Sequence, residues 1–421
     1  MNLSTIPLDS PPEEIDPSEE FSRQWGSTAT DDPYPMFEEF RASGPVVDKD
    51  IFVELGAVNT WNADGRRKVY SIVGYDAVKA CLSRPEIFSS AINAELSAHV
   101  RGRNLNMIDP PEHTRLRGIL QKSFTPARVN EWMEDLIRPE IDRLLSGIRP
   151  AGSADLDADF SYILPYRVTH KMFRLSERDY DNFHDLSIWT LLYHVRPDHA
   201  VWASKALALM LQDQIDASRG QVGTDVVTLL ANAQIEGDRL TDEEIVSFLR
   251  LLIPAGAETT TRGLALTFYA LLTHPDQLDL LRRQPDLIPK AVTESLRWQV
   301  PFGIEPRLVT QDTELGEVSI PAGALVLPCL AAANRDPEYF PDPAIFDIER
   351  EGKGPILSFG FSAHVCLGMN LARGEIAAAL EAVLVGLPNL RLDPDAPAPR
   401  MTGVGARGVD HLRVVFDASP A

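Results

Sequence analysis

The sequence predicts one large domain that is mainly α-helical, with small β-sheets at its periphery. Apolar residues recur at helical spacing through most of residues 110–253, and strand-like runs are short and few. No repeat or low-complexity linker interrupts the 421 residues, so we expect a single domain over residues 29–417. The strand-like runs are Val46–Val47, Val69–Ile72, Val318–Ile320, Leu325–Leu327 and His411–Phe416.

The chain is acidic overall, with 40 lysines and arginines against 61 aspartates and glutamates and a formal net charge of -21. A nucleic-acid-binding protein needs a concentrated positive surface to displace counterions, so no nucleic acid is expected as a partner. Hydrophobic residues make up 44% of the chain, enough apolar material to enclose a small molecule.

Residues 1–28 carry neither the positive start nor the apolar run of a signal peptide, so we expect a flexible acidic leader. No stretch approaches the roughly 20 apolar residues that span a bilayer, and no membrane association is expected. The three cysteines, Cys81, Cys329 and Cys366, are far apart, which argues against a disulfide framework or a paired zinc site. These features favour the cytoplasm.

Short elements are expected before residue 110. Helical patterns run from Met36 to Ala42 and from about Tyr75 to Leu82. Between Phe88 and Met107 the sequence has little periodicity and predicts a long loop. A loop of this length in a compact domain is usually functional or disordered.

A long buried helix is predicted from Thr241 to about Thr273. Thr241 and Glu244 have the spacing of a capping box, and nearly every turn carries apolar residues. About 33 residues at roughly 1.5 Å each give about 50 Å, enough to cross the domain. Its middle contains Pro254 and Glu258, which disfavour a regular buried helix. This interruption of a central helix indicates a site.

A second helix is predicted to start directly after Cys366 and to run to about Leu387. Its first amides and its positive end point back toward the sulfur, which stabilises a thiolate and lowers the pKa of the cysteine. Such a sulfur suits a nucleophile or a soft metal ligand. A buried structural cysteine is the alternative, because free cysteines are often buried.

The residues from Phe359 to Gly368, FGFSAHVCLG, resemble the haem-binding loop of the cytochrome P-450 family, Phe-Gly-x-Gly-x-His-x-Cys-x-Gly. One position departs from the pattern, because Ser362 stands where the family usually has glycine. If the backbone there needs a positive φ, serine costs on the order of 1 kcal/mol.

Four further motifs follow the family's order, and together the resemblance covers about residues 32–416. They are the propionate-helix start Asp109–Arg117, the oxygen-binding stretch Ala255–Thr260, the Glu294–Arg297 pair, and the segment Asn334–Phe346. The resemblance implies a soluble bacterial-type haem-thiolate monooxygenase with the single-domain cytochrome P-450 fold. It also implies haem b (iron protoporphyrin IX) between the long central helix and the helix after the cysteine loop.

The resemblance assigns roles to residues on both sides of the haem. Cys366 is implied as the iron ligand, and its thiolate donates electron density to the metal. Ala255 and Gly256 are implied to leave room for dioxygen. Thr259 is expected to donate a hydrogen bond to dioxygen, while Glu258 helps to bring protons from solvent. A buried polar pair in a helix kink is the alternative for these two residues.

Four cations resemble the family's donors to the two haem propionates: His113, Arg117, Arg307 and His364. Buried carboxylates need such partners. Arg115 could compete with Arg117, but the His-x-x-x-Arg spacing places His113 and Arg117 on one helical face.

Two further sets of charged residues are predicted, a buried ion pair and a basic surface patch. Glu294 and Arg297, one turn apart, are expected to form a buried structural ion pair with Arg335. A basic patch for an acidic ferredoxin is a hypothesis, with scattered solvated charges as an equal alternative. Its members would be Arg101, Arg103, Lys122, Arg128, Arg350, Lys353 and Arg373.

Substrate-facing positions follow from largely apolar segments that match the borders of the family's pocket. The candidates are Trp189, Leu251, Val300, Phe302, Ile304 and Val404. Simple core packing is nearly as good an explanation for each of them. Glu305 is expected to pair with Arg307.

The resemblance implies oxidation of a small or medium hydrophobic molecule, such as a terpenoid, fatty acid or aromatic compound. Dioxygen is the implied co-substrate. No reductase-sized extension or flavin fingerprint is present, so a separate ferredoxin and ferredoxin reductase are the implied electron donors. Two alternatives remain, a peroxygenase that uses hydrogen peroxide directly and a haem-binding sensor without turnover. The Glu258–Thr259 pair argues against both.

Overall fold

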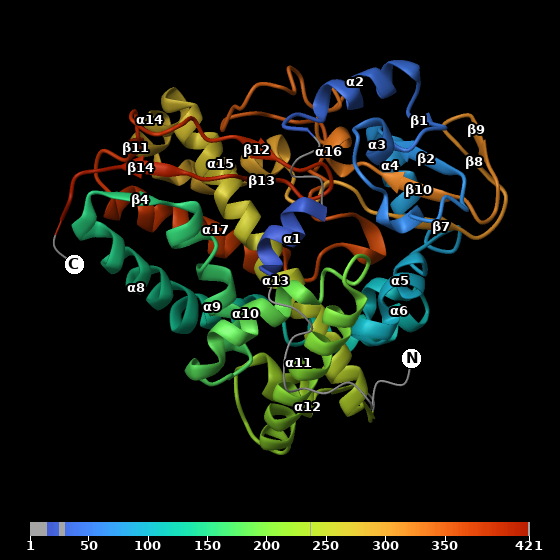
Figure 1. Cartoon of the computed structure of the whole chain (residues 1–421), viewed down its shortest axis with the longest axis horizontal. Helices are drawn as coiled ribbons and strands as arrows, with labels where there is room; N and C mark the ends of the chain where they lie inside the picture. The colour runs from blue at the N-terminus through green and yellow to red at the C-terminus, as the bar shows by residue number, and fades with distance from the viewer. Residues whose placement is uncertain (1–14, 25–29, 236, 420–421) are drawn as a thin grey trace.

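Helices dominate the computed structural model, which describes residues 15–24, 30–235 and 237–419 (Figure 1). The predicted helices at residues 36–42 and 75–82 are present as α2 (Tyr34–Ser43) and α4 (Tyr75–Leu82). The mainly α-helical fold class is therefore confirmed. Besides α1 and α5, which are described below, the α-helices before the long central one are α3 (Ile51–Glu54), α6 (Glu112–Gln121), α7 (Pro126–Trp132), α8 (Arg138–Ile148), α9 (Leu164–Met172), α10 (Tyr180–Trp189), α11 (Pro197–Ser218) and α12 (Val226–Asn232) in the described residues.

The largest sheet has five strands and lies to one side of the helical part (Figure 1). Strands β2 and β10 pair in parallel, with Tyr70 opposite Val326. In spatial order the strands are β1 (Val46–Val47), β2 (Val69–Ile72), β10 (Leu325–Pro328), β7 (Arg307–Val309) and β3 (Phe88–Ser89).

The remaining strands form small sheets, and all five strand-like runs of the sequence lie in or around a strand. A three-stranded sheet contains β11 (Arg391–Leu392), β14 (Arg413–Val415) and β4 (Ser153–Asp155). The two-stranded pairs are β5 (Gln234–Ile235) with β6 (Asp238–Arg239), β8 (Thr313–Leu315) with β9 (Val318–Ile320), and β12 (Met401–Thr402) with β13 (Gly408–Val409).

The predicted central helix is α13 (Asp242–Thr273), which runs through the middle of the molecule (Figure 1). The Thr241 amide donates to Glu244 Oε2 at 2.9 Å and the Glu244 amide donates to Thr241 Oγ1 at 3.2 Å, so the expected capping box is present. The helix continues through Pro254 without interruption. Apolar neighbours on both sides explain why it tolerates this proline, because packing stabilises buried helices more than propensity does.

The helix after the cysteine loop is α17 (Met369–Gly386), close to its predicted bounds. It packs against α13 so closely that a Cβ on Gly263 would lie 3.0 Å from Ile376 Cδ1. A side chain at position 263 would require Ile376 to shift by a few tenths of an ångström, so glycine suits this close approach. The helices between α13 and α17 are α14 (Pro275–Arg283), α15 (Ile288–Trp298) and α16 (Leu330–Ala333).

The expectation of a long loop from Phe88 to Met107 is wrong, because this segment contains helix α5 (Ile92–Arg101). Ile92 and Val100 are buried, and the Ser204 hydroxyl of α11 donates to the Val100 carbonyl. The apolar residues stand eight positions apart and so share one helical face. Polar residues around them obscured this stripe in the sequence.

The expected flexible leader, residues 1–28, contains helix α1 (Pro17–Gln24). Phe21 is only 2% exposed, and the Ser18 and Tyr162 hydroxyl groups are within hydrogen-bond distance at 2.5 Å. This part of the leader is therefore packed on the domain. Residues 1–14 and 25–28 lie outside the described residues.

The Glu294–Arg297 pair of α15 is buried as expected, with Arg297 Nε 2.6 Å from Glu294 Oε2. The third member of the cluster is Arg350, whose Nε donates to Glu294 Oε1 at 3.0 Å, and not the expected Arg335. Arg335 instead donates to the Trp298 carbonyl at 2.8 Å. The network thus joins α15 to the segment around residue 350.

Across the described ranges, no helix combines the length and the apolar character needed to cross a membrane.

Candidate active site

A cavity of about 390 Å³ lies between the middle of α13 and the loop that precedes α17. Segments far apart in the sequence line it, from α5 and α6 to the start of α17. It brings together every predicted residue of the cofactor and proton-relay sets, namely His113, Arg117, Ala255, Gly256, Glu258, Thr259, Arg307, Phe359, His364, Cys366 and Gly368.

The cysteine loop is a tight structure that presents Cys366 to the cavity. The Cys366 amide donates to the Phe359 carbonyl at 2.8 Å, which closes the loop on itself. The Cys366 sulfur accepts hydrogen bonds from the amides of Gly368 and Met369, at the start of α17. The predicted contact between the helix start and the sulfur is therefore present.

The pKa of Cys366 is raised, whereas the sequence predicted that the helix start would lower it. The Cys366 side chain is exposed to the cavity, but the surrounding protein still desolvates it and raises the pKa of the thiol above its ordinary value. The Gly368 and Met369 amides and the nearby Arg117 guanidinium lower the pKa, but they do not outweigh desolvation. Amide donors alone thus leave the thiol protonated near neutral pH, and a cation at the sulfur is needed to hold it as a thiolate.

Ser362 occupies the left-handed backbone region, with φ of +62°. Gly360 in the same loop has φ of +72°. The loop thus has two positions that favour glycine, and this chain fills one of them with serine. The sequence-based expectation of strain at Ser362 is met by the backbone geometry.

The four predicted propionate donors, His113, Arg117, Arg307 and His364, all line the cavity. The rings of His113 and His364 are 4.2 Å apart, and His364 Nε2 is 3.3 Å from Asp109 Oδ1. Burial lowers the pKa of His113 to about 4, and the positive charge of His364 and Arg117 lowers it further. Arg307 also lines the cavity and lies 3.3 Å from Glu305, as expected.

Arg117, not Arg115, is the arginine available to a ligand. Arg115 pairs with Asp238 at 2.8 Å and with Glu244 at 2.7 Å. Arg117 has no carboxylate partner within the described ranges, and it borders the cavity. A cavity with an unpaired guanidinium, two imidazoles and a second arginine fits a ligand with carboxylates, as the two propionates of haem require.

Small residues and hydroxyl groups line the cavity where α13 passes it. Ala255 and Gly256 leave open space there, and the nearest atom to a Cβ built on Gly256 is Thr169 Oγ1 at 3.7 Å. The Thr259 hydroxyl donates to the Ala255 carbonyl at 2.7 Å. The hydroxyl proton of Thr259 is therefore used in this hydrogen bond, and the hydroxyl oxygen can only accept a hydrogen bond from a group in the cavity.

Glu258 is 3% exposed and has two protein partners. The Tyr166 hydroxyl donates to Glu258 Oε2 at 3.0 Å, and Arg262 Nε donates to Oε1 at 2.7 Å. The sequence contains the Arg262 pairing, because the two residues are four positions apart on one helix. Tyr166 comes from α9 and could not be assigned without the tertiary fold.

Two buried carboxyl groups near the site were not predicted. Burial raises the pKa of Asp157 to about 7, with the negative charges of Asp155 and Glu258 adding to the effect and Arg262 opposing it. Burial alone raises the pKa of Glu375 to about 8. Glu375 lines the cavity from α17, and its Oε1 has no hydrogen-bond partner. Glu375 therefore favours the protonated form at neutral pH, whereas Asp157 is divided between its protonated and ionised forms.

Three of the six substrate-facing candidates line the cavity, namely Leu251, Phe302 and Ile304. The other three belong to the protein core and are wrong as cavity residues: Trp189, Val300 and Val404. Trp189 packs its ring on His199, with 4.3 Å between ring centroids. The direction of an apolar side chain depends on tertiary packing, which local sequence does not determine.

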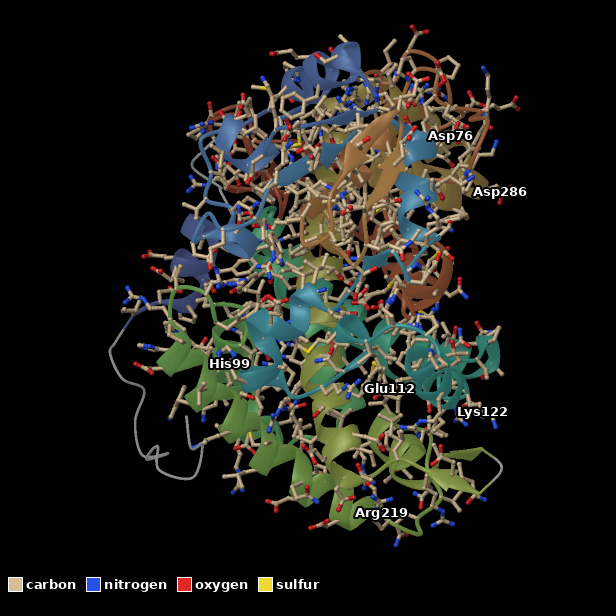
Figure 2. The ribbon with its side chains drawn as sticks, turned by 90° about the vertical axis from the view of Figure 1, so that its right-hand side faces the viewer. Asp76, His99, Glu112, Lys122, Arg219 and Asp286 are labelled. Atoms are coloured by element: carbon tan, nitrogen blue, oxygen red, sulfur yellow. The ribbon has the colours of Figure 1, made fainter. Side chains whose placement is uncertain are left out.

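Several residues of the hypothesised basic patch line the cavity or form ion pairs within the protein. Arg101 is directed into the cavity, and Arg350 belongs to the Glu294 network. Arg103 and Arg128 pair with Glu112 and Glu131. Lys122 and Lys353 remain exposed, and Lys122 lies on the face turned toward the viewer in Figure 2.

The chain matches the family model described as Cytochrome P450 over residues 180–394. It is 37% identical over 377 residues to the cytochrome P-450 monooxygenase PikC of Streptomyces venezuelae, covering 86% of this chain and 85% of that protein. It is 32% identical to the 6-deoxyerythronolide B hydroxylase of Saccharopolyspora erythraea, covering 92% and 96% of the two chains.

Solved structures show the same fold. The crystal structure of CYP109E1 from Bacillus megaterium with testosterone superposes with a TM-score of 0.80 at 30% sequence identity, covering 92% of this chain and 99% of that one. The expectations about family, fold class and reaction class are confirmed. This chain belongs to the cytochrome P-450 family, and it is a monooxygenase that uses haem b.

Proposed function

We propose that Cys366 would ligate the haem iron and that the cavity beside Cys366 oxidises a small-to-medium hydrophobic substrate with dioxygen. One observation carries this proposal, namely that the Cys366 sulfur, the four propionate donors and the Ala255–Thr259 stretch line one cavity. When bound, a thiolate-ligated haem supplies dioxygen activation, since the thiolate favours O–O cleavage. The iron is the cation that keeps Cys366 deprotonated despite its desolvation.

In this proposal Arg117, Arg307, His113 and His364 would hold the haem by its propionates. Arg117 and Arg307 offer paired N–H groups to carboxylates, and His113 and His364 add ring donors. His113 is neutral near pH 7, because its pKa is about 4, and so it contributes a hydrogen bond but no charge. Phe359 and Gly368 shape the loop below the ring.

Thr259 and Glu258 serve proton delivery in different ways. Because the Thr259 proton is directed to the Ala255 carbonyl, Thr259 accepts a hydrogen bond from a water in the cavity and holds that donor in place. This differs from the donor role expected from the sequence. Glu258 exchanges protons only after it loosens its contact with Arg262 or Tyr166, so these partners set how often it opens.

The electrons come from redox partners, as in monooxygenases of this family, and we assign the roles of donor to a ferredoxin and a ferredoxin reductase. Of the basic residues suggested for docking, Lys122 and Lys353 are exposed, and Arg373 is half-buried against the Phe359 ring without an ion pair among the described residues. These three members are still available. We place the protein in the cytoplasm, since its three cysteines are free thiols.

The variant Thr259→Ala tests the relay. It should retain haem and substrate binding, while product per electron consumed falls several-fold and hydrogen peroxide rises, because the donor water is no longer held. Thr273→Ala on the same helix is the matched control, since Thr273 makes the same kind of bond, to the Tyr269 carbonyl at 2.7 Å. Unchanged coupling in Thr259→Ala would remove Thr259 from the relay. Turnover that requires added peroxide and ignores reductase and ferredoxin would identify the peroxygenase alternative.

A further inference from the structure

Arg101, the last residue of α5, directs a positive charge into the cavity. Its Nε and Nη2 donate to the Thr190 carbonyl at 3.3 and 3.0 Å, and its guanidinium lies 5.0 Å from the centre of the Tyr193 ring. Arg101 and Tyr193 both line the cavity. His99, two residues earlier on α5, lies instead on the outer face turned toward the viewer in Figure 2. Two residues correspond to about 200° of helical rotation, so Arg101 is on the inner side.

No negative charge balances Arg101 in the described part of the chain. Its guanidinium makes no ion pair there, and burial lowers its pKa. The neighbouring Tyr193 is neutral, because burial raises its pKa. Burial, with the charges of Arg101 and His99, lowers the pKa of His194 to about 3, so that ring is neutral as well.

A second buried arginine adds positive charge to the same region. Arg250 of α13 donates to the Val100 carbonyl at 3.4 Å, next to Arg101 in the chain. Its Nε has no hydrogen-bond partner, and burial lowers its pKa to about 10. Arg250 is partly compensated by the charge of Glu243 and does not line the cavity, whereas Arg101 lines it without an ion pair to any described residue. A desolvated charge without a counter-charge is costly, so Arg101 favours an anion in the cavity.

The remaining bonds of Arg101 leave room for such an anion. The Thr190 carbonyl occupies Nε and Nη2, while Nη1 makes no bond to an acceptor of the described residues. The same cavity is lined by apolar side chains that include Leu105, Phe248 and Leu251. A guanidinium at the end of an apolar space matches a molecule with a carboxylate on a hydrocarbon body.

The contact between the end of α5 and α13 sets the distance from Arg101 to the Ala255–Thr259 stretch. Gly102 packs directly against Ser247 of α13. Ser247 precedes Ala255 by eight residues, which corresponds to about 12 Å along the helix. A carboxylate at Arg101 would therefore be on the order of 10 Å from the Ala255–Thr259 stretch, a separation that a medium-length hydrocarbon chain spans.

We propose that the substrate is an amphipathic carboxylic acid, bound with its carboxylate at Arg101 and oxidised at a carbon remote from that group. This inference rests on the proposed monooxygenase function, because it names the substrate of that same cavity. A purely structural role for Arg101 is the competing explanation, since it ends α5 and joins that helix to Thr190.

Binding of dodecanoate and of methyl dodecanoate to the haem-loaded protein separates these explanations. The two molecules share a hydrocarbon body and differ in charge. Calorimetry and the spin-state shift of the haem both report binding. We expect the wild type to bind the acid about 10-fold or more tightly than the ester. Arg101→Met should weaken acid binding by about 10- to 100-fold while ester binding changes less than about 3-fold. Arg101→Lys should retain part of the preference.

Arg103→Met is the matched control, because Arg103 is exposed and pairs with Glu112. It should leave both affinities unchanged. Equal affinity of the wild type for acid and ester would overturn the proposal, as would an equal loss of both in Arg101→Met. The carbon monoxide spectrum of the reduced protein distinguishes this failure from a failure of the proposed function. A thiolate-type spectrum without acid preference rejects only the carboxylate site.

Discussion

At Ser362 the backbone requires a conformation that its side chain disfavours. The residue has φ of +62° inside the loop that presents Cys366, where the family pattern has glycine. A left-handed conformation costs a residue with a Cβ about 1–2 kcal/mol. The neighbouring Gly360, also at positive φ, avoids this cost. The backbone strain in this loop therefore comes from the Cβ of Ser362.

Ser362→Gly should stabilise the protein by about 0.5–1 kcal/mol. The gain is smaller than the strain removed, because glycine also increases the freedom of the unfolded chain by up to about 1 kcal/mol. Urea unfolding of the haem-loaded protein measures the difference. Ser362→Ala is the control, since alanine retains the Cβ and should bring no gain. Equal stabilisation by both variants would exclude backbone strain as the cause.

Glu375 makes stability depend on pH. Its pKa is raised from 4.5 to about 8 by burial. Below pH 4.5 the folded and unfolded chains are both protonated at this residue. Between about pH 4.5 and pH 8 only the unfolded chain loses the proton, so the wild type loses stability as the pH rises through this window.

Glu375→Gln should remove this dependence. Relative to the wild type, the variant should gain nothing at pH 4.5 and on the order of 4 kcal/mol above pH 8. Denaturant unfolding at several pH values gives the difference curve. Glu381→Gln, at an exposed position of the same helix, controls for the loss of a carboxylate. A difference that does not change with pH would show that Glu375 ionises normally in the folded protein.

At the scale of elements, the buried Glu294 joins α15 to the segment around residue 350. Arg350 donates to Glu294, to the Pro341 carbonyl, and to the Ile345 carbonyl at 2.7 Å. Breaking such a cluster leaves a buried carboxylate with less compensation, which is more costly than losing a surface pair.

Arg350→Met should therefore destabilise the protein by about 3 kcal/mol. Lys353→Met, three residues away and exposed, should change stability by less than about 0.5 kcal/mol. Thermal unfolding together with haem retention measures both. A similar small effect of the two substitutions would show that Arg350 is a surface residue without a structural role.

The sequence was sufficient to predict the helices that have strong local sequence signals. The capping box defined the start of α13, and apolar spacing identified α2, α4 and α17. It was insufficient for α5, whose buried stripe is interrupted by polar residues, and for α1, whose helix is stabilised by burial of Phe21. Both helices depend on packing against distant parts of the chain, and local propensity does not report such packing.

At the scale of the whole molecule, the site is a cavity built from segments that are hundreds of residues apart. The residues expected at the cofactor site were assigned by the family resemblance, and all of them line this cavity. Trp189, Val300 and Val404 could not be sorted from Leu251, Phe302 and Ile304, since all six are apolar and only the fold decides which of them face the cavity. Arg101 was assigned to the surface by its charge, although the fold directs it inward.

The central claim is that the Cys366 sulfur binds the haem iron. The most direct test is the absorption spectrum of the reduced protein with carbon monoxide, recorded for the wild type, Cys366→Ser and the control Cys81→Ala. The wild type and Cys81→Ala should show the red-shifted Soret band of a thiolate ligand, and Cys366→Ser should lack it. Retention of that band in Cys366→Ser would contradict the account.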